Sequence, residues 1–229
     1  MATTAMRHFA EWWLTVAVFI GAAVLWQIGV VGLGIPAVVL PPPTAIVETL
    51  AASPGYFLAQ TWYTLLTTVA GFAAAVVVGT IFSILIGEVK FLEKTLYTLI
   101  FALNSVPKVA IAPLFVIWLG TGPGPKIAIA FLIAFFPIVI DTVLGLKSVP
   151  KEMLDLARSM RGARLDQFWR IRLPSALPSV FAGMKVGISL ALVGAIVGEF
   201  VASDHGLGYI ILTAQGTFDT AQIFAANIL

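Results

Sequence analysis

Few side chains in this 229-residue chain have the chemistry for catalysis. The chain has no cysteine, and its two histidines, His8 and His205, stand alone without neighbours at metal-ligand spacing. The chain therefore has no thiol for catalysis and too few histidines for a typical metal site. Ionisable residues do occur inside apolar stretches, where a charge is costly and usually faces a partner or a cavity. These residues are Lys108, Asp141, Lys185 and Glu199.

The composition is that of a membrane protein. Hydrophobic residues make up 60% of the chain and charged residues 10%, and the mean hydropathy is +1.03. A soluble domain carries about 25% charged residues, so these few charges would not cover a water-exposed surface. The net charge of +2 is too small to indicate nucleic-acid binding.

Apolar segments predict an all-α integral membrane fold with about six transmembrane helices. A helix crosses the hydrocarbon core with about 20 apolar residues, and residues 61–87 carry no charge at all. The last apolar segment reaches the end of the chain before it is long enough to cross, so we expect the sixth span to be truncated. The expected spans are 12–31, 61–87, 95–119, 127–146, 177–201 and an incomplete 220–229.

The basic residues predict that the N-terminus is cytoplasmic, because Lys and Arg in short loops stay on that side. Arg7, Lys90 and Lys94 fall on one side together with the basic segment 147–172, whereas the opposite loops hold Lys126 alone. In the first outer loop, Thr44 to Ala52 is expected to form a short amphipathic helix on the membrane face.

Two expected spans carry a small residue at nearly every fourth position, which allows close approach of helix backbones. We interpret both rows as packing surfaces within one bundle, in preference to a pore lining or a subunit interface. The first row is Thr67, Gly71, Ala75, Gly79, Ser83 and Gly87, and the second is Ser179, Gly183, Gly187, Ala191 and Ala195, with Gly194 and Gly198 beside it.

The segment from 147 to 178 predicts two short cytoplasmic helices. Pro150 can start the first helix, and Met153, Leu156, Ala157 and Met160 would form one apolar stripe along it. We expect a break at Gly162 and a second helix that ends at Leu173-Pro174. On this second helix Leu165, Phe168 and Trp169 would share a face and Asp166 would pair with Arg170. Such helices could dock a cytoplasmic partner or lie on anionic lipid.

This segment resembles the EAA loop of binding-protein-dependent ABC transporter permeases. Asp155-Leu156-Ala157 takes the place of Glu-Ala-Ala, Arg161 stands at the glycine position, and Ile171-Arg172-Leu173-Pro174 ends the motif at the family spacing. The departures are Asp for Glu, Leu for Ala, and a glycine displaced by one residue to Gly162.

Other stretches resemble the same family, in particular the subgroup of nitrate, sulfonate and taurine permeases and the related vitamin-precursor permeases. They are Leu40 to Thr44, Pro107 to Leu114, Trp118 to Gly120, Phe135 to Pro137, Gly198-Glu199 and Gly206 to Tyr209. The resemblance implies one permease domain of type I importer fold over residues 1–229, with its coupling segment at 147–176.

The resemblance also implies the partners. We expect a second permease copy in a homodimer, two cytoplasmic ATPase subunits, an extracytoplasmic solute-binding protein and a bacterial cytoplasmic membrane. The chain has no G-x-x-x-x-G-K-[ST] loop, so it is not expected to be an enzyme, and ATP and Mg would belong to the partner. The implied ATPase-coupling residues are Glu152, Met153, Asp155, Leu156, Ala157, Met160, Arg161 and Gly162.

Asn104, Lys108 and Glu199 are candidates for the translocation pathway. A cation beside a pore would favour anionic solutes, but Lys108 could also pair with Asp141 or Glu199 or extend to an interface. Glu199 could be a gate contact or a solvated helix end.

The expected solute is an anion of the nitrate, sulfonate or taurine type. A vitamin precursor, such as a thiamine pyrimidine or riboflavin, is the alternative within this family. An ion-coupled secondary transporter is the alternative from another class, but such a protein does not need the 147–178 segment.

Overall fold

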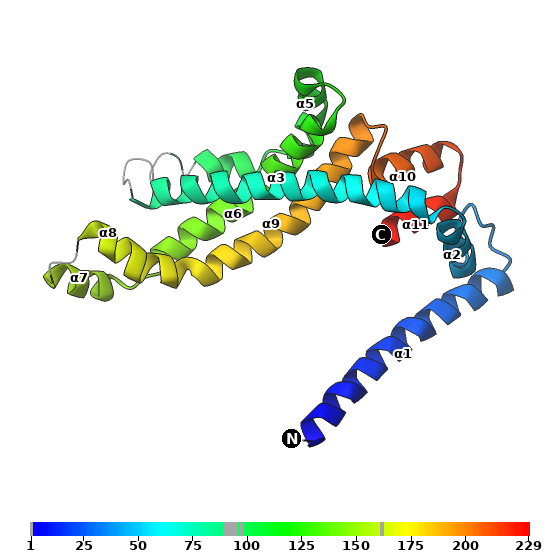
Figure 1. Cartoon of the computed structure of the whole chain (residues 1–229), viewed down its shortest axis with the longest axis horizontal. Helices are drawn as coiled ribbons and strands as arrows, with labels where there is room; N and C mark the ends of the chain where they lie inside the picture. Colours follow the sequence, from blue (N-terminus) through cyan, green and yellow to red (C-terminus); the bar gives the residue numbers. More distant parts are fainter. Residues whose placement is uncertain (1, 89–95, 97–98, 161–162) are drawn as a thin grey trace. The chain divides into compact units, whose positions relative to one another are not determined.

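The computed structural model describes residues 2–88, 96, 99–160 and 163–229 (Figure 1). The chain divides into two compact units, one made of residues 1–61 with 209–229 and the other of residues 62–208. The helices are α1 (Ala2–Gly32), α2 (Pro43–Ala52), α3 (Pro54–Glu88), α5 (Ala112–Leu119), α6 (Pro123–Lys147), α7 (Lys151–Ser159), α8 (Arg164–Gln167), α9 (Leu173–Val201), α10 (Leu207–Gly216) and α11 (Thr220–Ile228), with a 3₁₀ turn η1 (Lys108–Ile111) and a π-helical turn η2 (Phe168–Arg172).

In the unit that holds both termini, α2 is tied to α1 and packs against α11. The side chain of Gln27 donates to the Thr44 hydroxyl at 3.3 Å and accepts from the Thr44 backbone N–H at 3.2 Å. This second bond satisfies an N–H in the first turn of α2, which has no partner within the helix. The short helix expected at 44–52 is confirmed, beginning one residue earlier at Pro43.

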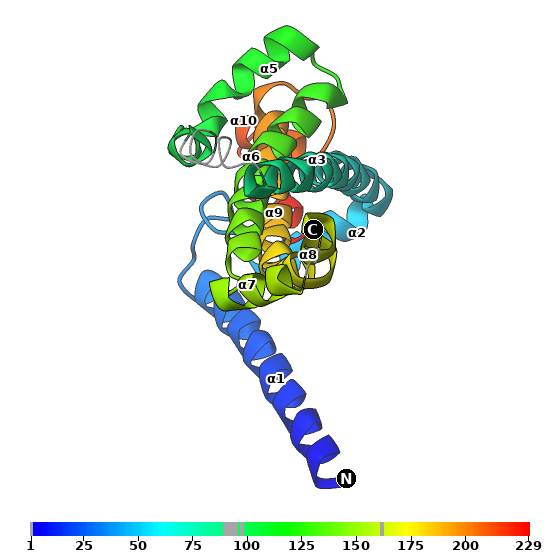
Figure 2. The same cartoon turned by 90° about the vertical axis from the view of Figure 1, so that its left-hand side faces the viewer.

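In the other unit, α3 and α9 both pack against α6, and Figure 2 shows α3 crossing this pair of helices. A methyl group added at Gly71 of α3 would lie 2.6 Å from the Cβ of Ala130, and one added at Gly194 of α9 would lie 2.7 Å from the Ala130 Cα. The Ser83 hydroxyl also donates across to the Val139 carbonyl at 3.3 Å. Both small-residue rows therefore pack on α6, as expected for packing surfaces within one bundle.

Among the residues that the structure describes, four helical segments are long and apolar enough to cross a membrane, namely Trp13–Gly32, Pro54–Gly87, Pro123–Lys147 and Phe168–Val201. The segment expected at 95–119, with interruptions at Pro107, Lys108 and Pro113, is broken at Pro107 in its described part. Residues 99–104 are helical, the chain leaves the helix before Pro107, and a 3₁₀ turn then leads into α5. Proline has no backbone N–H and disfavours helix in the residue before it, which accounts for the break.

The helix end expected at Leu173-Pro174 is wrong. The chain passes from α8 through η2 into α9 without leaving helical conformation. In η2 the Leu173 N–H donates to the Phe168 carbonyl, five residues earlier. Pro174 follows directly as the second residue of α9, immediately after this π-helical turn.

Candidate functional site

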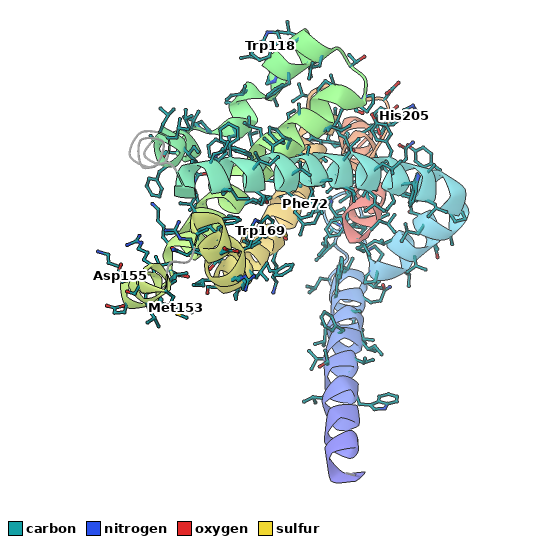
Figure 3. The ribbon with its side chains drawn as sticks, turned by 60° about the vertical axis from the view of Figure 1, so that its left-hand side comes forward. Phe72, Trp118, Met153, Asp155, Trp169 and His205 are labelled. Carbon is teal, nitrogen blue, oxygen red and sulfur yellow. The ribbon has the colours of Figure 1, made fainter. Side chains whose placement is uncertain are left out.

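The segment predicted to contact an ATPase contains an exposed amphipathic helix, α7, which begins at Lys151 directly after Pro150. Its apolar side chains face away from the protein: Met153 is 48% exposed, Leu156 63% and Met160 76%. Figure 3 shows Met153 and Asp155 together on this helix. The carboxylate of Asp155 accepts from Arg158 at 2.8 Å on the same surface.

The rest of the predicted coupling set lies around this stripe. Glu152 is exposed in the first turn of α7, where an acid is favourable to the helix dipole, and Ala157 follows Leu156 on the apolar side. Arg161 and Gly162 fall outside the described residues.

A cleft of about 320 Å³ opens between α7 and the next helical segment. Asp166 and Arg170 lie on one wall with their charged atoms 3.8 Å apart, which confirms the expected i, i+4 pair. The lining residues are Ala157, Met160, Asp166, Gln167, Arg170 and Ile171. The lining of this cleft thus combines apolar side chains with one positive and one negative charge.

The expectation that Phe168 and Trp169 share an exposed face is wrong. Phe168 is 6% exposed and packs with Leu146, Ala176 and Val180, whereas Trp169 is 59% exposed. The two residues are adjacent in the chain, and adjacent side chains of a helix point in different directions, so one of them can be buried while the other is exposed. Only Trp169 is therefore available to a partner.

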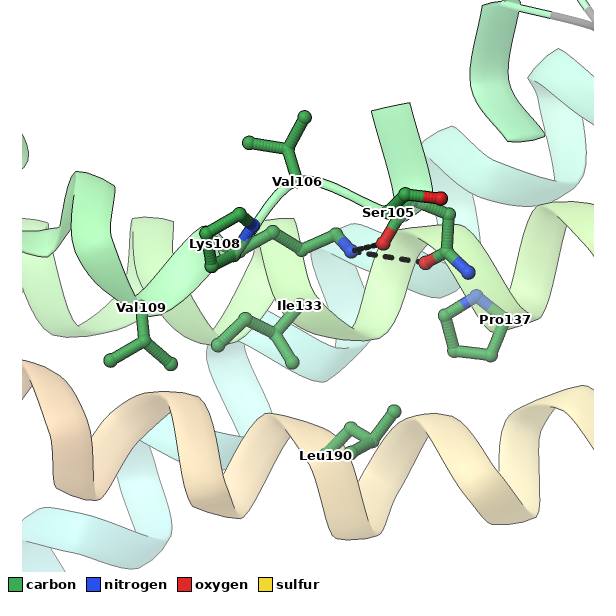
Figure 4. A pocket seen from close by; sticks show the side chains of 9 residues that line it. Ser105, Val106, Lys108, Val109, Ile133, Pro137 and Leu190 are labelled. Carbon is green, nitrogen blue, oxygen red and sulfur yellow. Dashed lines mark hydrogen bonds between the residues drawn. The ribbon is translucent and has the colours of Figure 1, made fainter. Parts of the chain in front are cut away.

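A second pocket, of about 420 Å³, lies where the third apolar segment leaves its helix (Figure 4). Lys108 extends its ammonium group to Asn104, donating to the backbone carbonyl at 2.8 Å and to the side-chain oxygen at 3.0 Å. The same ammonium lies 4.4 Å from the centre of the Phe136 ring, a cation–π distance. Ile133, Pro137 and Leu190 complete an apolar wall.

The structure brings Asn104 and Lys108 together as predicted, and the two side chains share one pocket. It does not support the alternative partners considered for Lys108, because the ammonium is bonded to Asn104 rather than to Asp141 or Glu199. A pocket with an apolar wall and one cation can orient an anionic or polar solute.

Glu199 lies elsewhere, and the view that it is a solvated helix end is wrong, since it is completely buried. Its carboxylate accepts from the Thr64 hydroxyl and from the Gly208 backbone N–H, both at 2.8 Å. No pattern in the sequence singles out Thr64 among the other threonines of its apolar stretch.

Lys126 is a second residue that sequence reasoning misplaced. The distribution of basic residues predicts an outer-loop position for Lys126, but its side chain is completely buried in the first turn of α6. Its ammonium group donates to the backbone carbonyls of Thr121, Gly122 and Ala202. Within the described ranges, no three His, Asp or Glu side chains gather closely enough to hold a metal ion.

Comparison with known proteins identifies a family of membrane transport components. The family model for the binding-protein-dependent transport system inner membrane component matches residues 75–229. A riboflavin transport system permease protein of Chloroflexus aurantiacus is 38% identical over 205 residues, which cover 89% of this chain and 76% of that protein. A formylaminopyrimidine transport permease protein of Halalkalibacterium halodurans is 32% identical over 207 residues, covering 90% and 83% respectively.

A solved structure shares the fold. The inward-facing MetNI methionine ABC transporter matches with a TM-score of 0.54 at 17% identity, over 77% of this chain and 91% of that one. The long apolar helices, the exposed helix α7 and these matches lead to one conclusion. The chain belongs to the family of binding-protein-dependent transport system inner membrane components, the membrane-spanning permease subunits of ABC importers.

Proposed function

We propose that this permease works as a homodimer in a bacterial cytoplasmic membrane, with two ATPase subunits on α7 and a solute-binding protein on the outer side. ATP and Mg would be held by the ATPase chains. The observation that carries the proposal is the exposed apolar stripe of Met153, Leu156 and Met160 on α7.

This stripe supports a protein partner for a physical reason. Met153 and Leu156 on α7 and Met160 directly after it are three large apolar side chains rimmed by charged ones, a surface typical of a protein contact. The adjoining cleft could accept a side chain of the ATPase between Met160 and Ile171. ATP-driven movement of the ATPase pair would then be transmitted through α7 to the spans.

The test is co-purification of the ATPase from native membranes in mild detergent with Mg-ATP and vanadate. We expect recovery of the ATPase with the unaltered chain and its loss when Met153, Leu156 and Met160 are all changed to Asp. The matched control is Met153→Leu, Leu156→Met and Met160→Leu, which keeps an apolar stripe and should keep the ATPase. An equal loss in both triple variants would contradict an apolar contact.

For the solute, the Lys108 pocket supports an anion of the nitrate, sulfonate or taurine type. The ammonium donates to Asn104 with two of its three N–H groups and has one left for a ligand. In proteoliposomes containing the complete transporter, Lys108→Met should lower uptake of such an anion by about tenfold or more, the equivalent of one lost charge-assisted hydrogen bond. Lys108→Arg should preserve most of the uptake.

A second solute class is favoured by the relatives named above, whose names specify riboflavin and formylaminopyrimidine. An aromatic heterocycle would use the apolar wall of Ile133, Pro137 and Leu190 rather than the charge. In that case Lys108→Met would leave uptake nearly unchanged and Leu190→Asp would abolish it. Uptake driven by an ion gradient without ATP would instead indicate a secondary transporter.

A further inference from the structure

The buried carboxylate of Glu199 belongs to a closed set of hydrogen bonds that neither the α7 surface nor the Lys108 pocket uses. Glu199 Oε1 accepts from the Thr64 hydroxyl, and Thr64 in turn accepts from the Leu207 backbone N–H at 2.8 Å. Glu199 Oε2 accepts from the next backbone N–H, that of Gly208. Two side chains on α3 and α9 thus bind two consecutive N–H groups where α10 begins, and those groups have no partner within that helix.

Gly206 allows the turn to approach the carboxylate. Its φ of +104° lies in a region that other residues rarely adopt. A Cβ at this position would overlap the carboxylate of Glu199. The backbone of the turn therefore lies directly on the carboxylate, with no room for another side chain.

The turn carries an exposed polar tip formed by Asp204 and His205. The imidazole ring of His205 lies 5.6 Å from the ring of Tyr63, which precedes Thr64 on α3. Ser203 donates to the His205 carbonyl at 2.6 Å and accepts from its N–H at 3.3 Å. The tip is thus held to the same end of α3 as the buried bonds below it.

We propose that Thr64 and Glu199 are positioning residues for transport, which lock the 203–208 turn so that Asp204 and His205 are presented in one geometry to the solute-binding protein. The proposal rests on the proposed function, which puts α7 on the cytoplasmic side. The turn follows the opposite end of α9, a helix long enough to span the membrane, and so lies on the outer side. A buried carboxyl group with two hydrogen bonds can hold a turn, and losing one partner leaves a buried polar atom unsatisfied, which is costly. The lock acts through the turn and does not itself touch the solute.

The first test measures the lock without any partner. Because the chain has no cysteine, Leu207→Cys introduces a single thiol at a buried position of the turn. Its rate of reaction with a membrane-impermeant maleimide in native membranes reports how often the turn opens. We expect slow reaction in the otherwise unaltered chain and an increase of about tenfold when Thr64→Val removes both hydroxyl bonds.

Two variants control for packing. Thr64→Ser keeps the hydroxyl and should restore slow labelling. Thr68→Val makes the same change one turn further along α3, at a buried hydroxyl that has no hydrogen-bond partner among the described residues, and should also label slowly. Equal labelling of the Thr64→Val and Thr68→Val chains would overturn the lock.

A second pair of variants applies if Thr64→Val does not fold. Gly206→Ala opens the turn from the other side. Its control is Gly216→Ala, where an added methyl group meets no atom within 4 Å.

The second test measures the consequence for transport. In the reconstituted complex, Thr64→Val should raise the concentration of binding protein that gives half-maximal stimulation of ATP hydrolysis by about tenfold, without changing basal hydrolysis. If Thr64 had only a structural role, Thr64→Val would lower the basal and the stimulated rates of ATP hydrolysis together. That result would overturn the positioning role. If no ATPase assembles with the chain, the proposed function fails, whereas the labelling result still decides the lock.

Discussion

Lys126, buried in the first turn of α6, donates a hydrogen bond to the backbone carbonyl of Ala202, the C-cap residue directly after α9. Helix C-termini leave carbonyl groups without a partner in the helix, and a cation is favourable there because of the helix dipole. The same ammonium group binds the carbonyls of Thr121 and Gly122 before α6. One side chain therefore fastens the start of α6 to the end of α9.

Replacing Lys126 with Met should destabilise the protein. The change keeps most of the side-chain length but leaves three carbonyl groups without their donor, which corresponds to about 2–4 kcal/mol in the free energy of unfolding. The matched control is Lys185→Met, which removes the same charge from an exposed position on α9. Thermal unfolding in detergent, followed by size-exclusion chromatography, should show a lower midpoint for the first variant only. Equal midpoints would mean that water satisfies these carbonyls.

Gly194→Ala should loosen the contact between α6 and α9. A Cβ there would lie 2.7 Å from the Ala130 Cα and 3.0 Å from its backbone nitrogen. Backbone atoms cannot rotate away as a side chain can, so the helices must separate at a cost of about 1–3 kcal/mol. Gly79→Ala, whose Cβ would meet only side-chain atoms of Ile138 and Val139 at 3.2 Å or more, should cost less.

The control for this series is Gly21→Ala on α1, where an added methyl group meets no atom within 4 Å. Unfolding midpoints should fall in the order Gly21→Ala, Gly79→Ala and Gly194→Ala, with the last the lowest. A midpoint for Gly194→Ala equal to that of Gly21→Ala would contradict close backbone packing at this crossing.

The sequence predicted the fold where one physical signal dominated. Uninterrupted apolar length located α3, and the rows of small residues identified the surfaces that pack on α6, because both properties depend on local composition. The prediction failed at Leu173-Pro174, where a proline competes with apolar length. Whether a proline ends a helix depends on which backbone bonds its neighbours can replace, and the π-helical turn before Pro174 was not visible in the residue pattern.

Among the site residues, too, only those determined by a local pattern could be predicted from the sequence. The α7 stripe could be predicted because it follows helical periodicity within one short segment. The partners of Glu199 could not, since Thr64 and Gly208 are 135 and 9 residues away from it along the chain. Such long-range polar contacts are specified by the packing of three helices. A single threonine gives no indication of them in the sequence.

Asp155→Asn should leave stability unchanged. Asp155 and Arg158 form an ion pair at 2.8 Å, but their side chains are both more than half exposed. Exposed pairs of this kind contribute less than about 0.5 kcal/mol, so the unfolding midpoint should not move. The ATPase co-purification assay should nevertheless show weaker retention, because Asp155 takes the acidic place of the coupling motif. A lower midpoint with full ATPase retention would instead assign Asp155 a structural role.

Phe168 and Trp169 are neighbours in the sequence with opposite environments, which makes them a matched pair for separating stability from coupling. Phe168→Ala empties a site between Leu146, Ala176 and Val180 and should lower the free energy of unfolding by roughly 3–5 kcal/mol. Trp169→Ala removes an exposed side chain, so its unfolding midpoint should stay close to that of the unaltered chain. If the ATPase covers this surface, Trp169→Ala should lower ATPase retention while the folded protein remains intact, since large aromatic side chains often dominate such contacts. A loss of stability in Trp169→Ala equal to that in Phe168→Ala would show that both side chains belong to the core and would remove Trp169 from the coupling surface.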